Sequence, residues 1–165
     1  MGTTTVRAPT RSVQPIRAIA ERGATGAGLA VIVNTLLLVV GQRFVDIPVG
    51  FDPLSIGSVV TASAAGAVAA TVVYAVLDRL VTETDRLMTG IASFVLILSL
   101  VPVFVVAPTL AEGVGPGVLV LLVLMHAVVA VASVGALTHG EMFERARETA
   151  ESDRAEEGER PEQES

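Results

Sequence analysis

Two polar side chains, Asn34 and His126, stand inside long uncharged stretches of the chain. An amide and an imidazole can join two helices by a hydrogen bond or bind a ligand, and the imidazole can also carry a proton. If both stretches are helices that cross a membrane, the two side chains lie at similar depths, roughly 13 Å below the same surface at ~1.5 Å per residue. Asn34 and His126 are therefore a candidate intramembrane polar pair, which can bond if their two helices touch.

Three interpretations of this pair stay open. The first is a structural hydrogen bond between helices, worth roughly 0.6 kcal/mol in a membrane. The second is a ligand-binding or proton-handling role, and the third is a histidine that faces lipid. A two-histidine site within one subunit is not expected, because His126 stands near the middle of its stretch and His139 at the end, about half a bilayer away.

Four long stretches of the chain contain no Asp, Glu, Lys, Arg or Cys, and they cover residues 23–42, 53–77, 87–111 and 113–140. Proton- or ion-coupled transporters usually keep an ionisable side chain within the bilayer, and intramembrane proteases need a nucleophile with its base or two carboxylates. The chain has no cysteine, which excludes a thiolate metal site and a disulfide scaffold. We therefore expect no enzymatic activity, no metal and no cofactor.

Each stretch has the length of one transmembrane helix, because about 20 residues at ~1.5 Å each cross a hydrocarbon core of ~30 Å. Lipid offers no partners to backbone N–H and C=O groups, so such segments must be helical. With 52% hydrophobic residues, the chain is expected to be an all-α polytopic membrane protein, a bundle of four transmembrane helices. The predicted spans are about residues 23–42, 55–77, 87–107 and 116–138.

Arginine positions set the expected orientation, since the chain has no lysine. Ten of the 11 arginines belong to the two termini and to the connection between the second and third spans, and only Arg43 falls on the other side. The positive-inside rule then places both termini in the cytoplasm, in a multi-pass protein of the cell membrane. On this prediction, residues 1–22 form a polar cytoplasmic segment, residues 23–140 the transmembrane domain, and residues 141–165 a cytoplasmic tail.

The net charge of −6 belongs to residues 141–165, because residues 1–140 carry as many arginines as acids. Beyond about residue 153 the tail has no large apolar side chain, so disorder is expected there. The missing lysine and the many glutamates resemble proteins of salt-accumulating halophiles, whose acidic surfaces stay soluble. A solubilising tail and a partner-binding tail both stay open. A nucleic-acid partner is not expected, because the chain lacks a basic groove.

Small residues recur at every fourth position of the second span, at Ala62, Gly66 and Ala70. Such a stripe lets another helix come close, either within the bundle or in a second copy of the chain. Packing within the bundle is the first interpretation, and a homo-oligomer is the alternative.

Prolines and aromatic residues predict local features of the spans. Pro102 lacks the N–H that would bond the carbonyl of Leu98, which predicts a kink in the third span, and Ser99 is expected to satisfy part of the freed carbonyl set. Pro108 is expected to end that span, and Pro116 suits the first turn of the fourth. Tyr74 and the loop phenylalanines Phe44 and Phe51 are expected at the membrane interface.

Four short motifs follow one another along the spans: Val33-Asn34-Thr35-Leu36, Val45-Asp46-Ile47-Pro48 with Asp52-Pro53-Leu54, Ser99-Leu100-Val101-Pro102, and Leu124-Met125-His126. Their order resembles a family of small prokaryotic four-span membrane proteins catalogued as a domain of unknown function. The resemblance covers roughly residues 23–138 and leaves out both tails. It implies the four-span architecture but no activity, and it strengthens Asn34 and His126 as a pair.

The leading hypothesis is a non-enzymatic membrane protein of structural or accessory type, with the lipid bilayer as its partner. The alternative is a small transporter or channel subunit whose path runs near Asn34, His126 and the Pro102 kink. The absence of charge within the spans favours the first hypothesis. Solute flux that disappears in a His126→Ala variant would favour the second.

Overall fold

The computed structural model describes residues 14–140, and every regular element in that range is helical. In chain order the elements are α1 (Ile16–Gly41), the 3-10 helix η1 (Asp52–Leu54), α2 (Ile56–Leu80), α3 (Thr84–Val105), α4 (Ala107–Leu110) and α5 (Pro116–Thr138). The predictions made for the first residues of the chain and for the acidic tail lie outside the described residues.

Helices long and apolar enough to cross a membrane are α1, α2, α3 continued by α4, and α5. The prediction of an all-α fold with four membrane-spanning helices is confirmed. α1, α2 and α3 extend beyond the uncharged stretches, most of all α1, which begins at Ile16. Charged residues do not end a helix, and Arg17 forms an ion pair with Glu21 one turn later at 2.8 Å. The hydrogen bonds of α1 therefore continue past the charged residue at which the uncharged stretch ends.

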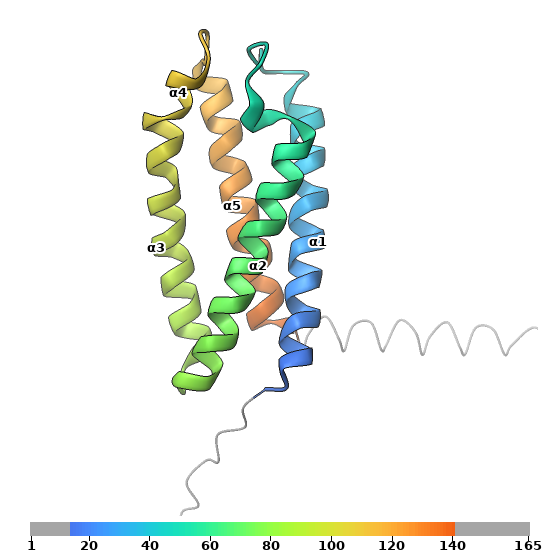
Figure 1. Cartoon of the computed structure of the whole chain (residues 1–165), viewed down its shortest axis with the longest axis vertical. Helices are drawn as coiled ribbons and strands as arrows, with labels where there is room; N and C mark the ends of the chain where they lie inside the picture. The colour runs from blue at the N-terminus through green and yellow to red at the C-terminus, as the bar shows by residue number, and fades with distance from the viewer. Residues whose placement is uncertain (1–13, 141–165) are drawn as a thin grey trace, which may run out of the picture.

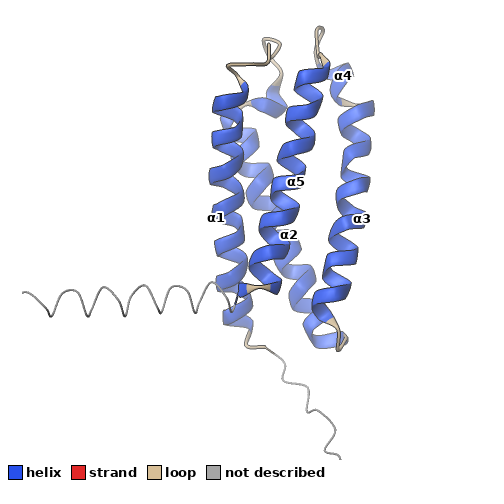
Figure 2. Ribbon diagram, turned by 180° about the vertical axis from the view of Figure 1, so that it is seen from behind, coloured by secondary structure: helices blue, strands red, loops and turns tan. Residues whose placement is uncertain are grey.

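The four long helices stand side by side and run alternately in opposite directions (Figure 1). α1 packs against both α2 and α5, and α5 also packs against α3. Seen from behind, α5 lies between α1 and α3 (Figure 2). α2 and α3 start together at their short connection and diverge from it, because α2 leans toward α1 (Figure 1). The described chain begins and ends at one end of the molecule, called here the terminal end; the opposite end is the loop end.

Two glycines let α1 approach its neighbours closely. Gly23 lies against the side chain of Thr71 on α2. Gly26 faces α5, where a Cβ at its position would stand 3.1 Å from Ala136 Cβ and 3.2 Å from the carbonyl oxygen of Ala132. Helices in lipid associate through such close packing, because lipid removes the hydrophobic driving force between them.

Prolines mark two of the helix starts at the loop end. Pro116 stands in the first turn of α5, as predicted. Pro108 was expected to end the third span, but α3 already ends at Val105, and Pro108 lies in the first turn of the short helix α4. A proline fits a first turn because the missing N–H would have no helical partner there.

Pro102 lies inside α3, one turn before the helix ends. The hydroxyl of Ser99 donates to the carbonyl oxygen of Leu96 at 2.7 Å, so it does not satisfy the carbonyl of Leu98 as expected. The helix continues through the proline, and the N–H of Val106 donates to Pro102 O at 2.8 Å. A kink at Pro102 stays a prediction.

Two hydrophobic clusters close the bundle, one near each end. The terminal-end cluster consists of Ile19, Tyr74, Met88 and Leu137. Phe51, expected at the lipid interface, is only 4% exposed, because the loop before η1 folds back onto the helices. It belongs to the loop-end cluster, which contains Leu38, Phe51, Leu54, Val59, Val103, Ala107, Val118, Leu121, Leu122 and Met125.

Candidate functional site

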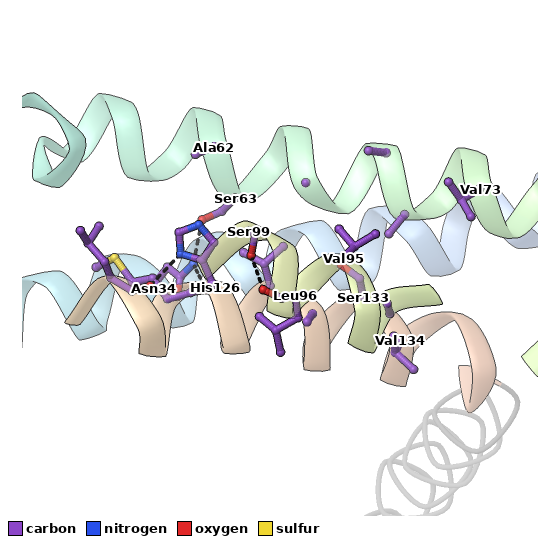
Figure 3. A pocket seen from close by; sticks show the side chains of 18 of the residues that line it. Asn34, Ala62, Ser63, Val73, Val95, Leu96, Ser99, His126, Ser133 and Val134 are labelled. Atoms are coloured by element: carbon purple, nitrogen blue, oxygen red, sulfur yellow. Dashed lines mark hydrogen bonds between the residues drawn. The ribbon is translucent and has the colours of Figure 1, made fainter. Parts of the chain in front are cut away.

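A cavity of about 640 Å³ lies inside the bundle. Side chains of α2, α3 and α5 form its walls, and Asn34 reaches it from α1 (Figure 3). Met125 of the loop-end cluster and Met88 of the terminal-end cluster both line it, so the cavity occupies the space between the two clusters. None of its lining residues is Asp, Glu, Lys or Arg. It is therefore an apolar space with a few uncharged polar groups.

One side chain, Asn34, joins three helices at the wall of this cavity. It is 2% exposed, and its Nδ2 donates to Ser63 Oγ of α2 at 2.9 Å and to the carbonyl oxygen of Met125 on α5 at 3.2 Å. These bonds join different helices. Most serine and threonine hydroxyls of the bundle instead bond a carbonyl oxygen of their own helix. Asn34 thus fixes the relative positions of α1, α2 and α5 at one depth.

His126 lines the same cavity but makes its hydrogen bond within its own helix. Its Nδ1 stands 2.8 Å from the carbonyl oxygen of Leu122, one turn earlier. A carbonyl oxygen only accepts, so Nδ1 donates, and the neutral ring then presents Nε2 as an acceptor. The structure brings Asn34 and His126 to one cavity (Figure 3), but within residues 14–140 no hydrogen bond joins the two side chains.

Buried polar atoms without partners stand beside the cavity. Asn34 Oδ1 and Ser133 Oγ have no hydrogen-bond partner among residues 14–140, although their side chains are only 2% and 3% exposed. An unsatisfied buried acceptor or donor costs about 1–3 kcal/mol. Such groups are rare in folded proteins and need an explanation, of which a bound molecule is one.

The predicted stripe of small residues faces the cavity. Ala62, Gly66 and Ala70 all line it, and a Cβ on Gly66 would stand 2.9 Å from Val129 Cγ1 of α5. α2 meets α1 through its neighbouring face, where Ser63 accepts the bond from Asn34 and Thr71 lies against Gly23. Small residues on α2 therefore allow close contact with α1 on one face, and on the other face they line the cavity beside a close contact of Gly66 with α5.

The cavity reaches the surface of the bundle between α2 and α3. Its exposed lining residues all belong to these two helices, namely Ala62, Ala69 and Val73 on α2 and Val95 on α3. The lining residues of α1 and α5 are buried or half-buried. The opening therefore faces sideways, along the length of helices that are apolar enough to cross a membrane.

A second set of polar contacts holds the terminal end together. Tyr74 is 1% exposed, and its hydroxyl donates to Asp85 Oδ1 at 2.8 Å, which joins α2 to α3. The prediction that Tyr74 anchors the helix in the membrane interface is therefore wrong, because its ring is enclosed in the terminal-end cluster. The N–H of Gln14 donates to Asp78 Oδ2 at 3.0 Å, and Arg22 Nη1 donates to Gln14 Oε1 at 2.9 Å. These bonds connect the start of α1 to the end of α2.

The sequence-based site did not include Ser63, Ser133 or Asp85. A serine in an apolar run carries little signal, because its hydroxyl can bond its own helix. The position of Ser63 along its helix was one indication of a contact with Asn34. Ser63 stands seven residues from the loop end of α2, and Asn34 stands seven residues from the loop end of α1. Whether α1 and α2 turn these residues toward each other depends on how the helices pack.

The comparison with protein families finds one match of long extent. The model of a family described as "Family of unknown function (DUF6069)" matches residues 14–141. The matched region contains all four long helices, the cavity and both members of the polar pair. No curated protein and no solved structure matches the chain.

Proposed function

The chain belongs to DUF6069, a family of unknown function, and on that premise we propose that it is a non-enzymatic accessory protein that holds a membrane-soluble molecule in its cavity. The observation that carries the proposal is the cavity of about 640 Å³, which is apolar, lies between two hydrophobic clusters and opens between α2 and α3. Binding sites for small molecules are typically apolar concavities of this size with a few placed polar groups. A space with a sideways opening exchanges its contents with lipid.

The chemistry of the lining supports binding without catalysis. Covalent catalysis needs a nucleophile held within hydrogen-bond reach of its base. The histidine of the cavity, His126, bonds a carbonyl oxygen through Nδ1, and Ser63 accepts a bond from Asn34. No serine of the described chain bonds His126, so the cavity lacks the contact that would activate a hydroxyl.

A small transporter or channel subunit is the second candidate, because Asn34 and His126 line the same cavity. A conduction path needs polar groups or water along the whole crossing. Here Asn34, Ser63 and His126 lie at one level, with Ser133 farther toward the terminal end (Figure 3), and hydrophobic clusters bound the cavity toward both ends. This arrangement supports an accessory protein over a solute path.

The cell membrane, with both termini in the cytoplasm, is the proposed location. The positive-inside rule supports this orientation, since ten of the 11 arginines belong to the termini and to the α2–α3 connection. The lipid bilayer is the proposed partner. Self-association stays a separate proposal, and crosslinking that yields only monomer in lipid would contradict it. The predicted stripe does not require a second copy, because Gly66 faces Val129 of its own chain.

Solute flux separates the two candidates. The full chain is reconstituted in liposomes, and the release of encapsulated ions and small polar dyes is compared with protein-free liposomes. The proposal predicts no excess flux for the wild type. Flux that His126→Ala abolishes and that His139→Ala retains would replace the accessory role by transport, because His139 is exposed at the terminal end and outside the cavity.

A further inference from the structure

We propose that the cavity binds an uncharged single-chain lipid with a hydroxyl group, which places its hydroxyl at His126 and its chain along α2, α3 and α5. This inference rests on the proposed function and adds the chemical class of the ligand. It draws on three features of the cavity: its length, the acceptor on His126 and its lack of charge.

The cavity is long and runs parallel to the helices. Its lining extends from Ser58 to Val73 on α2 and from Leu122 to Val134 on α5. At ~1.5 Å per residue these stretches measure roughly 22 Å and 18 Å. An elongated apolar space of this kind fits an extended chain better than a compact ring system.

Most polar groups of the cavity stand in the part nearer the loop end, and Ser133 of α5 lines the part nearer the terminal end. His126 and Asn34 lie there with Ser63 (Figure 3). The rest of the lining, with Ala70, Val129 and Met88, is apolar apart from Ser133. A molecule with one polar end and an apolar body matches this order. Its chain would then point toward the terminal-end cluster.

The acceptor on His126 requires a hydrogen-bond donor. Because Nδ1 of His126 donates to Leu122 O, Nε2 of the neutral ring is an acceptor on a residue of the cavity wall. A hydroxyl group donates one hydrogen bond and satisfies this acceptor. An alkane would leave the acceptor unpaired, and a carboxylate would set negative charge against it with no cation in the lining.

The opening between α2 and α3 admits such a lipid from the bilayer. Ala69 and Val95 stand at this opening and are exposed, so the chain needs no passage through either hydrophobic cluster. The small side chains of Ala62, Gly66 and Ala70 leave the space that the chain would fill. The stripe thus acquires a use that does not depend on a partner helix.

Photolabelling of the full-length protein in lipid nanodiscs tests the proposal. The probes are hexadecanol, hexadecanoic acid and hexadecane, each with a diazirine at the same chain position, and labelled peptides are identified by mass spectrometry. The alcohol is expected to label the cavity lining about three- to tenfold more than either matched probe, which corresponds to one net hydrogen bond. Unlabelled hexadecanol is expected to compete.

Two pairs of variants separate the ligand class from the proposed function. Ala69→Phe fills the opening and is expected to reduce labelling by all probes about tenfold, while Ala65→Phe, on an exposed position of the same helix outside the lining, leaves it unchanged. His126→Leu is expected to abolish the preference for the alcohol, while His126→Gln, which restores an acceptor, and His139→Leu retain it. Monodisperse elution of each variant in size-exclusion chromatography confirms that it folds.

The outcomes point in different directions. If labelling is insensitive to Ala69→Phe, nothing occupies the cavity and both the ligand class and the proposed function are wrong. If Ala69→Phe blocks labelling but the three probes label equally, the proposed function stands and the hydroxyl lipid is wrong. A preference for hexadecanoic acid, or a preference for the alcohol that survives His126→Leu, also overturns the ligand class.

Discussion

Asn34 joins three helices of the bundle. Its Nδ2 bonds Ser63 and the carbonyl oxygen of Met125, so one side chain connects α1 to both of its neighbours. The sequence indicated that Asn34 is special, because an amide in an apolar stretch needs partners. It could not indicate which partners, because Ser63 and Met125 enter the site only through the rotation of their helices.

Replacing Asn34 by leucine is expected to destabilise the protein by about 1–2 kcal/mol. The variant loses two hydrogen bonds between helices, each of which contributes roughly 0.6 kcal/mol to stability in a membrane. Ser63 Oγ and the carbonyl oxygen of Met125 then lose the donor that Asn34 supplies. Unfolding in a titration from mild detergent into SDS measures the change.

Thr35→Ala is the matched control, because the hydroxyl of Thr35 bonds only Val31 O of its own helix. It is expected to change stability by less than about 0.5 kcal/mol. An Asn34→Leu variant as stable as Thr35→Ala would show that the bonds between helices contribute nothing.

Tyr74 and Asp85 are expected to couple by about 1 kcal/mol. The Tyr74 hydroxyl is buried in the terminal-end cluster and donates to Asp85 Oδ1 at 2.8 Å, while Asp85 itself is exposed to water, which weakens the bond. A double-mutant cycle of Tyr74→Phe and Asp85→Ala isolates this interaction. Additive effects of the two substitutions would mean that the bond does not form in the membrane protein.

At the scale of the element, α1 shows most clearly how far sequence patterns reach. Its apolar length predicts a span, and its glycines are compatible with close packing at several positions. Gly26 faces α5, whereas nothing stands within 4 Å of a Cβ placed on Gly28. The difference is one of helix rotation, which the composition of an evenly apolar helix does not encode.

The same substitution at these two glycines is expected to have opposite effects. Gly26→Ala places a methyl group 3.1 Å from Ala136 Cβ and 3.2 Å from Ala132 O, and the forced shift of α1 from α5 is expected to cost about 1–3 kcal/mol. Gly28→Ala meets no atom and is expected to stabilise the helix by about 0.5–1 kcal/mol. The SDS titration reads out both variants, and equal effects would mean that α1 does not meet α5 through Gly26.

α2 shows what spacing leaves open. The stripe of Ala62, Gly66 and Ala70 was predicted to pack within the bundle or against a second copy; Gly66 lies close to Val129 of α5, and all three residues also line the cavity. The contact with α1 belongs to the adjacent face with Ser63 and Thr71. Both faces carry small residues, so spacing alone does not distinguish a packed face from an open one.

At the scale of the whole molecule, the four apolar helices are determined by the composition of each segment, whereas the cavity between them is determined by how the helices are arranged. The helices follow from segment length and hydropathy. The cavity depends on the divergence of α2 and α3 from their connection (Figure 1), while α5 packs against both. The proposed topology belongs to this scale, because it concerns the side of the membrane on which each connection lies.

Single cysteines test the topology, and the chain has no cysteine to remove. Val49 lies in the loop before η1 and is fully exposed, and Thr82 lies exposed in the α2–α3 connection. Each is replaced by cysteine in a separate variant. A membrane-impermeant maleimide is expected to label Val49→Cys in intact cells and Thr82→Cys only after permeabilisation, because the arginines favour a cytoplasmic terminal end. The reverse pattern would invert the proposed orientation.

The sequence by itself determined the class of the protein, its four long apolar helices and one of its buried polar residues, Asn34. These properties depend on the transfer of each segment from water to lipid, which is a sum over the residues of that segment. Only the tertiary structure decided that Asn34 bonds Ser63 and Met125, that Tyr74 is enclosed, and that the small residues of α2 border an opening. Each of these depends on how apolar helices rotate against one another, and in lipid that rotation is set by close packing and a few hydrogen bonds between helices.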